Sequence, residues 1–173
     1  MAIKYKFAIV SLKLYYYICY VSEKEFSLLK IINMSTLRFQ ALREASTRKP
    51  FQFEEAEKKS GVKIDGHIVL LCTGFHARNY HDRKQIVWGN PELTVEATKW
   101  LFDRGSKMHG VEGPSTDKPT SNLFPQHRLC RDLGVSHFEW LVNLEKVVGK
   151  GEFQFIGLPI KFKGGSGSPV RAV

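Results

Sequence analysis

A histidine and a glutamate twelve residues apart, His127 and Glu139, form the pair in this sequence whose residue types could do chemistry. His127 lies near the start of a short helical pattern that ends at Gly134, and Glu139 lies in an apolar stretch. A carboxylate there is costly to bury unless a cation or hydrogen-bond donors meet it. Because neutral imidazole and carboxylate are ordinary zinc ligands, the pair could hold a metal ion. Two alternatives stay open: Glu139 on a solvated helix face, and His127 as a surface capping residue.

The helices and strands that we expect around this pair indicate an α/β fold, with a mixed sheet and helices outside it. The expected helices cover residues 50–60 and 95–104, and the expected strands cover residues 67–72, 107–111, 152–157 and 170–173. Thr94 is the expected N-cap of the second helix, and Gly105 is its expected stop. Pro159 is expected at an edge, a bulge or a strand end, because proline cannot donate to a sheet ladder.

Other polar residues receive structural interpretations. Residues 76–82 contain two histidines but are interpreted as a polar loop, and His109 as a partly buried residue with its hydrogen bonds satisfied rather than as a ligand. Residues 113–122 form a second polar loop, which would carry function if anything outside residues 124–144 does, since functional residues concentrate in loops.

The net charge of +9 would suit a protein that binds nucleic acid, but the distribution of the charge along the chain argues against that partner. Residues 1–49 hold nine Lys and Arg and three Asp and Glu, a balance of +6 that leaves only +3 for residues 50–173. No basic stripe interleaved with aromatic residues appears in that second part. We therefore expect no nucleic-acid partner.

Three widely spaced cysteines, Cys19, Cys72 and Cys130, form no Cys-x-x-Cys pair. Neither a disulfide framework nor a thiolate zinc site is indicated by this spacing. Cys72 lies in an apolar strand and Cys130 in a short helix, so both are interpreted as small core residues. Cysteines that form no disulfide suit a reducing compartment, and we expect a cytoplasmic protein.

The amino-terminal stretch is atypical. Residues 7–21 are apolar except for a serine and a lysine, a run shorter than the about 20 residues that a membrane span needs. No small-residue cleavage site follows, so a signal peptide is not indicated and no membrane partner is expected. We divide the chain into a basic, aromatic extension over residues 1–49 and a body over residues 50–173, and expect residues 1–33 not to be a native part of the fold.

A run of ordered motifs resembles one known family. The first comprises His127-Arg128-Leu129, Gly134-Val135, Glu139 and Asn143-Leu144, and further segments are residues 66–75, 90–101, 111–117, 157–161 and 165–171. Together they resemble the second half of the putative cyclase family, which includes bacterial-type kynurenine formamidase and isatin hydrolase. The resemblance covers about residues 55–173. The chain departs from the family's pattern at His67 and Glu112, where the family usually has Asp, and at Phe75, where it has Trp.

The resemblance implies a swivelling β/β/α fold and metal-assisted hydrolysis of aryl amides. The implied substrates are N-formylkynurenine, an intermediate of tryptophan catabolism, or a cyclic amide such as isatin. His127 and Glu139 would bind a divalent ion, zinc in the first place and manganese in the second, and Phe75 would contact the substrate. A homodimer is also implied, while Asn143 and Arg171 are expected to be structural.

The family's principal metal motif, H-x-G-T-H-x-D-x-P-x-H, does not occur in this sequence. That motif supplies most of the family's ligands and a histidine thought to act as acid and base. Two ligands alone hold zinc poorly, because catalytic zinc sites use three protein ligands and a water. A second function therefore stays open: a truncated, non-catalytic homologue that acts as an interaction or oligomerisation module. A third alternative is a truncated product without a stable fold, since lost strands leave sheet edges open.

Overall fold

The computed structural model describes residues 18–19, 29–33, 47–48, 50–66, 68–148, 153–160 and 162–173. In this part of the chain, six strands form a mixed sheet in the order β2-β4-β6-β7-β1-β9. The strands are β1 Ile18–Cys19, β2 Leu29–Asn33, β4 Ile68–Cys72, β6 Met108–Val111, β7 Ser136–Phe138 and β9 Gly167–Ser168. Two further pairs are β3 Thr47–Arg48 with β5 Glu92–Leu93, and β8 Gly157–Pro159 with β10 Val170–Ala172.

The centre of the sheet is parallel and buried on both faces. Strands β2, β4, β6 and β7 pair in parallel, and β1 is antiparallel to both β7 and β9. All five residues of β4 are buried, as an unbroken apolar run predicts for a parallel strand covered on both sides. Val69 and Leu71 belong to one core cluster, whereas Ile68, Leu70 and Cys72 belong to the other. The alternation of side chains along a strand produces this division.

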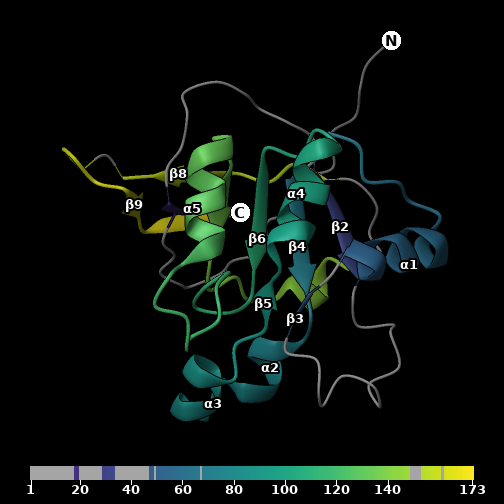
Figure 1. Ribbon diagram of the computed structural model, residues 1–173. Helices are drawn as coiled ribbons and strands as arrows, with labels where there is room; N and C mark the ends of the chain where they lie inside the picture. The colour runs from purple at the N-terminus through teal and green to yellow at the C-terminus, as the bar shows by residue number, and fades with distance from the viewer. Residues whose placement is uncertain are drawn as a thin grey trace.

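Three helices border the core cluster that holds Val69 and Leu71. They are α1 Pro50–Ser60, α4 Val95–Asp103 and α5 Pro125–Leu133, and Figure 1 shows α4 and α5 side by side in front of the parallel strands. Phe53 of α1 and Leu101 of α4 fill this core. The Gln126 amide joins α5 to its neighbour, because it accepts from the Thr98 hydroxyl and donates to the Leu93 carbonyl, both at 2.6 Å.

The caps of these helices follow the sequence signals. The Thr94 hydroxyl accepts a hydrogen bond from the Ala97 N–H at 3.1 Å, which confirms the predicted N-cap of α4. Gly134 is the C-cap of α5, and its φ of 65° is the left-handed conformation that favours glycine at a helix end. The signals therefore place both helices to within a residue or two.

Two sequence-based expectations were wrong. Residues 76–79 are not a loop but part of the short helix α2 Phe75–Asn79. Residues 80–82 form a turn into the short helix α3 Arg83–Trp88, which the Asp82 carboxylate caps. The strand expected over residues 152–157 also differs, because β8 begins at Gly157 and ends at Pro159. Pro159 thus ends a strand, as expected, and the expected closing strand is present as β10.

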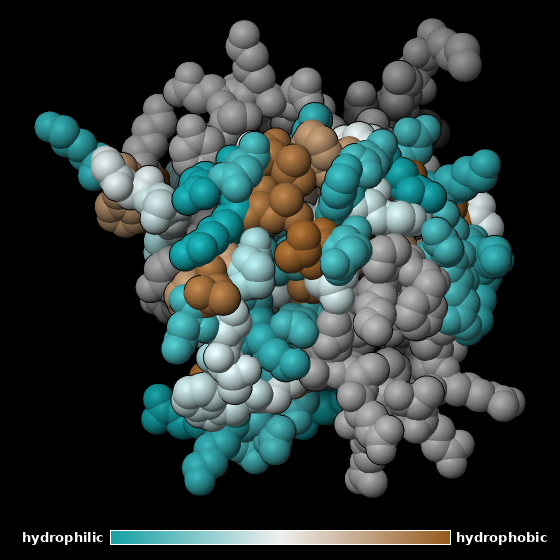
Figure 2. Space-filling model, viewed as in Figure 1, coloured by the Kyte–Doolittle hydropathy of each residue, from teal (hydrophilic) through white to brown (hydrophobic). Residues whose placement is uncertain are grey.

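Charged side chains cover much of the outer surface of the helices. On the face seen in Figure 2, hydrophilic side chains lie along the outer sides of α4 and α5, and apolar side chains gather between them. Among the described residues, none of the helices has the length and apolar character needed to pass through a lipid bilayer.

Cys72 lies in the core and is 2% exposed, as expected for a small core residue. Burial, and after it the negative charge of Glu112, raises the pKa of its thiol to about 12. Since the thiolate is the nucleophile, Cys72 is expected to be unreactive at pH 8 in the folded protein.

Thiol labelling of the wild type and of Cys72→Ala tests this expectation. In urea, the variant should label one thiol fewer than the wild type, whereas both folded proteins should label the same number at pH 8. A thiol that labels rapidly in the folded wild type and is missing from folded Cys72→Ala would contradict the assignment.

Candidate metal centre

The candidate site lies where three parallel strands end. Thr73 follows β4, Glu112 follows β6 and Glu139 follows β7, and the parallel pairing of these strands brings their carboxyl ends to one edge of the sheet. In open α/β sheets, ligands bind outside this edge. The backbone N–H of Trp140 donates to the Gly113 carbonyl at 2.8 Å and so holds the two segments after β6 and β7 together.

Glu139 is a buried residue at the end of a strand, 7% exposed. Its Oε1 accepts from the Thr116 N–H at 3.3 Å and lies 3.5 Å from His127 Nε2. The solvated helix face considered for Glu139 was therefore wrong. The structure brings His127 and Glu139 together, although nothing in their spacing of twelve residues required it.

Asp117 anchors the amino-terminal end of α5. Its carboxylate accepts from the backbone N–H of Gln126 at 2.8 Å and of His127 at 3.1 Å, and from the His127 ring Nδ1 at 2.5 Å. Burial raises the pKa of Asp117, but these hydrogen bonds outweigh it and leave the pKa below its usual value. The carboxylate therefore caps the helix in place of Phe124, the residue at the cap position, which makes no side-chain capping bond.

The same contact determines which nitrogen of His127 faces the site. With Nδ1 donating to Asp117, Nε2 presents its lone pair on the side of Glu139. A carboxylate behind a histidine is the usual support of a metal-ligating imidazole, because it fixes the tautomer and the ring orientation. Sequence reasoning missed Asp117 as a site residue, although it placed the residue in a polar loop that could carry function.

His137 is the third member of this group, and sequence reasoning missed it as well. Its Nε2 lies 3.3 Å from Glu139 Oε1, and its ring meets that of His127 edge to face at 4.9 Å between centroids. One ligand atom from each of His127, His137 and Glu139 lies within 4.8 Å of the others. The available signal was the two-residue spacing of His137 and Glu139, which puts both side chains on one side of an extended chain.

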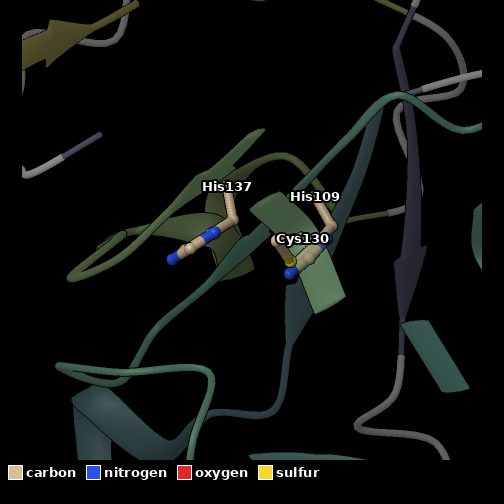
Figure 3. Close-up of side chains that lie close together, drawn as sticks. All are labelled: His109, Cys130 and His137. Carbon is tan, nitrogen blue, oxygen red and sulfur yellow. The ribbon is translucent and has the colours of Figure 1, made fainter. Parts of the chain in front are cut away.

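A second, deeper group shares His137. His109 on β6 is the register partner of His137 on β7, and their rings stack at 5.5 Å between centroids. Cys130 of α5 completes this group, and Figure 3 shows its sulfur beside the His109 ring. Burial, and then the rings of His137 and His127, lowers the pKa of His109 to about 3, so this imidazole is neutral.

The interpretation of His109 as a partly buried, satisfied residue was wrong. The side chain is 1% exposed, and its Nε2 has no hydrogen-bond partner among the described residues. Cys130, by contrast, is 2% exposed and was correctly predicted to be buried.

Glu112 and Phe75 lie at the end of β4. The Glu112 carboxylate accepts from the Thr73 N–H at 2.5 Å, from the Thr73 hydroxyl at 2.6 Å and from the Phe75 N–H at 3.2 Å. Glu112 therefore closes the turn after β4. Phe75 is 7% exposed, and its role as a substrate contact stays a prediction. His67, the other departure from the family's pattern, lies outside the described residues.

Asn143 and Arg171 are members of neither ligand group. Asn143, in the left-handed conformation with a φ of 57°, precedes the short 3-10 helix η3 Leu144–Lys146. Arg171 is an exposed residue of β10, opposite Leu158 of β8. The structural roles expected for them stay predictions.

Comparison with protein families gives a match to the model described as Putative cyclase over residues 24–118. The division of the chain at residue 49 stays a prediction. A kynurenine formamidase from Salinibacter ruber is 38% identical over 73 residues, which are 42% of this chain and 34% of that protein. The match thus spans about a third of the length of this curated relative.

Solved structures confirm the α/β fold. Isatin hydrolase A from Ralstonia solanacearum has a TM-score of 0.73 at 21% identity, over 91% of this chain and 69% of that one. An isatin hydrolase bound to the product analogue thioisatinate has a TM-score of 0.73 at 18% identity, with the same coverage. A predicted metal-dependent hydrolase from Bacillus stearothermophilus has a TM-score of 0.65 at 15% identity, over 91% of this chain and 74% of that one.

We expect Asp117→Asn to destabilise the metal-free protein by about 1.5–3 kcal/mol, the usual worth of a buried hydrogen bond to a charged group. The same variant should bind metal roughly 10- to 100-fold more weakly, because His127 loses its support. Urea unfolding and competition with a chelator measure the two effects.

Asp103→Asn is the matched control. Asp103 pairs with Lys99 on the exposed face of α4, and such pairs contribute under about 1 kcal/mol. Equal losses of stability in the two variants would contradict the anchoring role of Asp117.

Proposed function

The chain belongs to the putative cyclase family, and from this premise we propose that it is a metal-dependent hydrolase of aryl amides. The substrate class is an N-formyl aryl amine such as N-formylkynurenine, or a cyclic aryl amide such as isatin. The curated relative is a kynurenine formamidase and two of the similar structures are isatin hydrolases, which supports this choice.

The observation that carries the proposal is the meeting of His127, His137 and Glu139 at the carboxyl edge of the sheet. Two imidazoles and one carboxylate are a ligand set that catalytic zinc sites use, with a fourth position left for water or substrate. His127 is the most accessible of the three, with 30% of its side chain exposed, so the group has a side open to solvent. The sequence predicted only two ligands, His127 and Glu139, and in the proposed site His137 is the third.

The residues of the chain fit a divalent ion chemically. Asp117 holds the His127 ring with Nδ1 protonated, and this leaves Nε2 as the ligand atom. The Glu139 carboxylate supplies a negative charge within 3.5 Å of two imidazole nitrogens. Zinc is the ion we propose, with manganese second.

When bound, the ion supplies Lewis-acid activation of the amide carbonyl and of water. The overall reaction adds one water across the C–N bond and yields a carboxylate and an aryl amine; from an N-formyl amine the carboxylate is formate. Glu139 is itself only 7% exposed, and electrostatic interactions of a carboxylate are stronger where it is shielded from water.

An aromatic surface beside the open ligand suits an aryl substrate. Phe124 precedes α5, is 52% exposed, and its ring meets that of His127 edge to face at 6.0 Å between centroids. Its φ of 47° is unusual for a residue with a side chain, and such backbone strain is found preferentially at functional sites. Leu123, 68% exposed, extends the apolar surface.

The test is metal content and hydrolysis of N-formylkynurenine by the purified full chain. We expect near-stoichiometric zinc or manganese by plasma mass spectrometry, and release of formate. Glu139→Gln and His137→Gln should each weaken metal binding beyond the roughly 10- to 100-fold that loss of a supporting residue costs.

His81→Gln is the matched control, since His81 is an exposed histidine outside both ligand groups. It should keep metal and activity. A wild-type protein without bound metal, or activity that Glu139→Gln leaves unchanged, would overturn the proposal.

A second candidate function, association with a second copy of the chain, is favoured by one apolar surface. Leu158, Ile160 and Phe162 alternate along one segment and are 70%, 59% and 55% exposed. Within the described residues, β8 pairs on one side only, with β10. A strand with a free edge and exposed apolar side chains is suited to pairing with another chain.

Sedimentation equilibrium tests this second candidate. We expect a dimer that Ile160→Asp weakens, because a buried charge opposes association. Val95→Asp, a substitution at an exposed apolar residue of α4, should leave the dimer intact. A monomeric wild type would exclude the dimer, and a non-catalytic interaction module would associate without showing hydrolysis.

A further inference from the structure

A buried ligand group shares His137 with the hydrolytic one, and the proposed reaction uses neither of its other two members, His109 and Cys130. His109, Cys130 and His137 come from β6, α5 and β7, and their ligand atoms lie within 4.8 Å of one another. Figure 3 shows the three side chains together, with the two histidines on neighbouring strands. All three residues are at most 2% exposed.

The packing of apolar side chains does not account for this group. The Nε2 atom of His109 is buried and has no hydrogen-bond partner among the described residues. An unsatisfied polar atom in the interior costs about 1–3 kcal/mol, so native proteins rarely retain one without a reason. A metal ion bound at this nitrogen would remove the cost.

The chemistry of the ligands points to a particular class of ion. A thiolate and two neutral imidazoles favour a borderline or soft ion such as Zn²⁺ over Mg²⁺ or Ca²⁺, which prefer oxygen. Zinc bonds of about 2.3 Å to sulfur and about 2.0 Å to nitrogen would place the ligand atoms roughly 3.3–3.7 Å apart. The distances between ligand atoms would therefore shorten by up to about 1.5 Å, and the cysteine would lose its proton on binding.

We propose that His109, Cys130 and His137 bind a zinc ion that fastens α5 to the parallel sheet. Cys130 lies three residues after His127 on α5, so an ion held here would fix the helix that carries the hydrolytic ligand. The group supplies three protein ligands, so a small ligand such as water would take the fourth position of the ion; because all three residues are buried, they leave no approach for a substrate, and the role of the ion is structural.

His137 belongs to both ligand groups, and its imidazole has two nitrogens. A neutral imidazole has one N–H and one lone pair, so with both ions bound the ring loses its N–H proton to solvent and bridges them as an imidazolate, with one nitrogen bound to each ion. The two groups differ in one measurable respect: only the buried one contains sulfur. This difference makes the test of the buried site independent of the hydrolytic function.

The experiment is a titration of the metal-free full chain with Co²⁺, followed by absorption spectroscopy. A cobalt–thiolate bond produces a sulfur-to-metal charge-transfer band in the near ultraviolet, which histidine and carboxylate ligands do not produce. We expect this band to reach the intensity of one cobalt–thiolate bond per chain at saturating cobalt and to disappear when Zn²⁺ displaces the cobalt, since zinc binds more tightly to such ligands.

Three variants assign the band. Cys130→Ser should abolish it, whereas Cys72→Ser, at a buried cysteine outside the group, should retain it. Glu139→Gln should also retain the band while it loses hydrolysis, which separates the two sites. Zinc should raise the melting temperature of the wild type and of Cys72→Ser by more than that of Cys130→Ser, which keeps only the hydrolytic ligand group.

The measurement on the wild type is sufficient to overturn the proposal, so the test does not depend on whether each variant folds. A wild type without the band at saturating cobalt would exclude a thiolate-bound ion. A band that survives in folded Cys130→Ser, or disappears in folded Cys72→Ser, would assign the sulfur ligand to another cysteine.

Discussion

The buried carboxylate of Asp117 holds the loop after β6 against the first turn of α5, and the geometry of the candidate site depends on this contact. The carboxylate accepts hydrogen bonds from two backbone N–H groups of the helix and from the ring of His127. An anion at this end of a helix is also favoured by the helix dipole. Because one group both begins α5 and orients its histidine, formation of the helix and assembly of the site occur together.

The parallel pairing of β6 with β7 determines which imidazoles meet. His109 and His137 are register partners, so both side chains lie on the face of the sheet that α5 covers. Glu139 follows His137 by two residues and continues the same side. Burying His109, His137 and Glu139 on one side of the sheet costs free energy unless ions or hydrogen bonds compensate for the lost contact with water. Both proposed metal sites address that cost, and both depend on His137.

The proposed metal site depends on three residues of the described part of the chain. His127, His137 and Glu139 each offer a ligand atom within 4.8 Å of the others. Glu112, which replaces the family's usual Asp, closes the turn after β4 with its hydrogen bonds to Thr73 and Phe75. These hydrogen bonds of Glu112 fix the end of β4 beside the proposed site.

The sequence alone determined the helices with clear caps, the buried strand β4, and the candidate pair His127 and Glu139. These features depend on local patterns: the side chain of Thr94, the left-handed Gly134, and an unbroken apolar run. The tertiary structure decided that Asp117, His137, His109 and Cys130 surround that pair. Their contacts join segments far apart in sequence, through strand register and helix packing, and no local pattern encodes such a meeting. The helices at residues 75–88 escaped prediction because they are short, with few apolar residues to show a period.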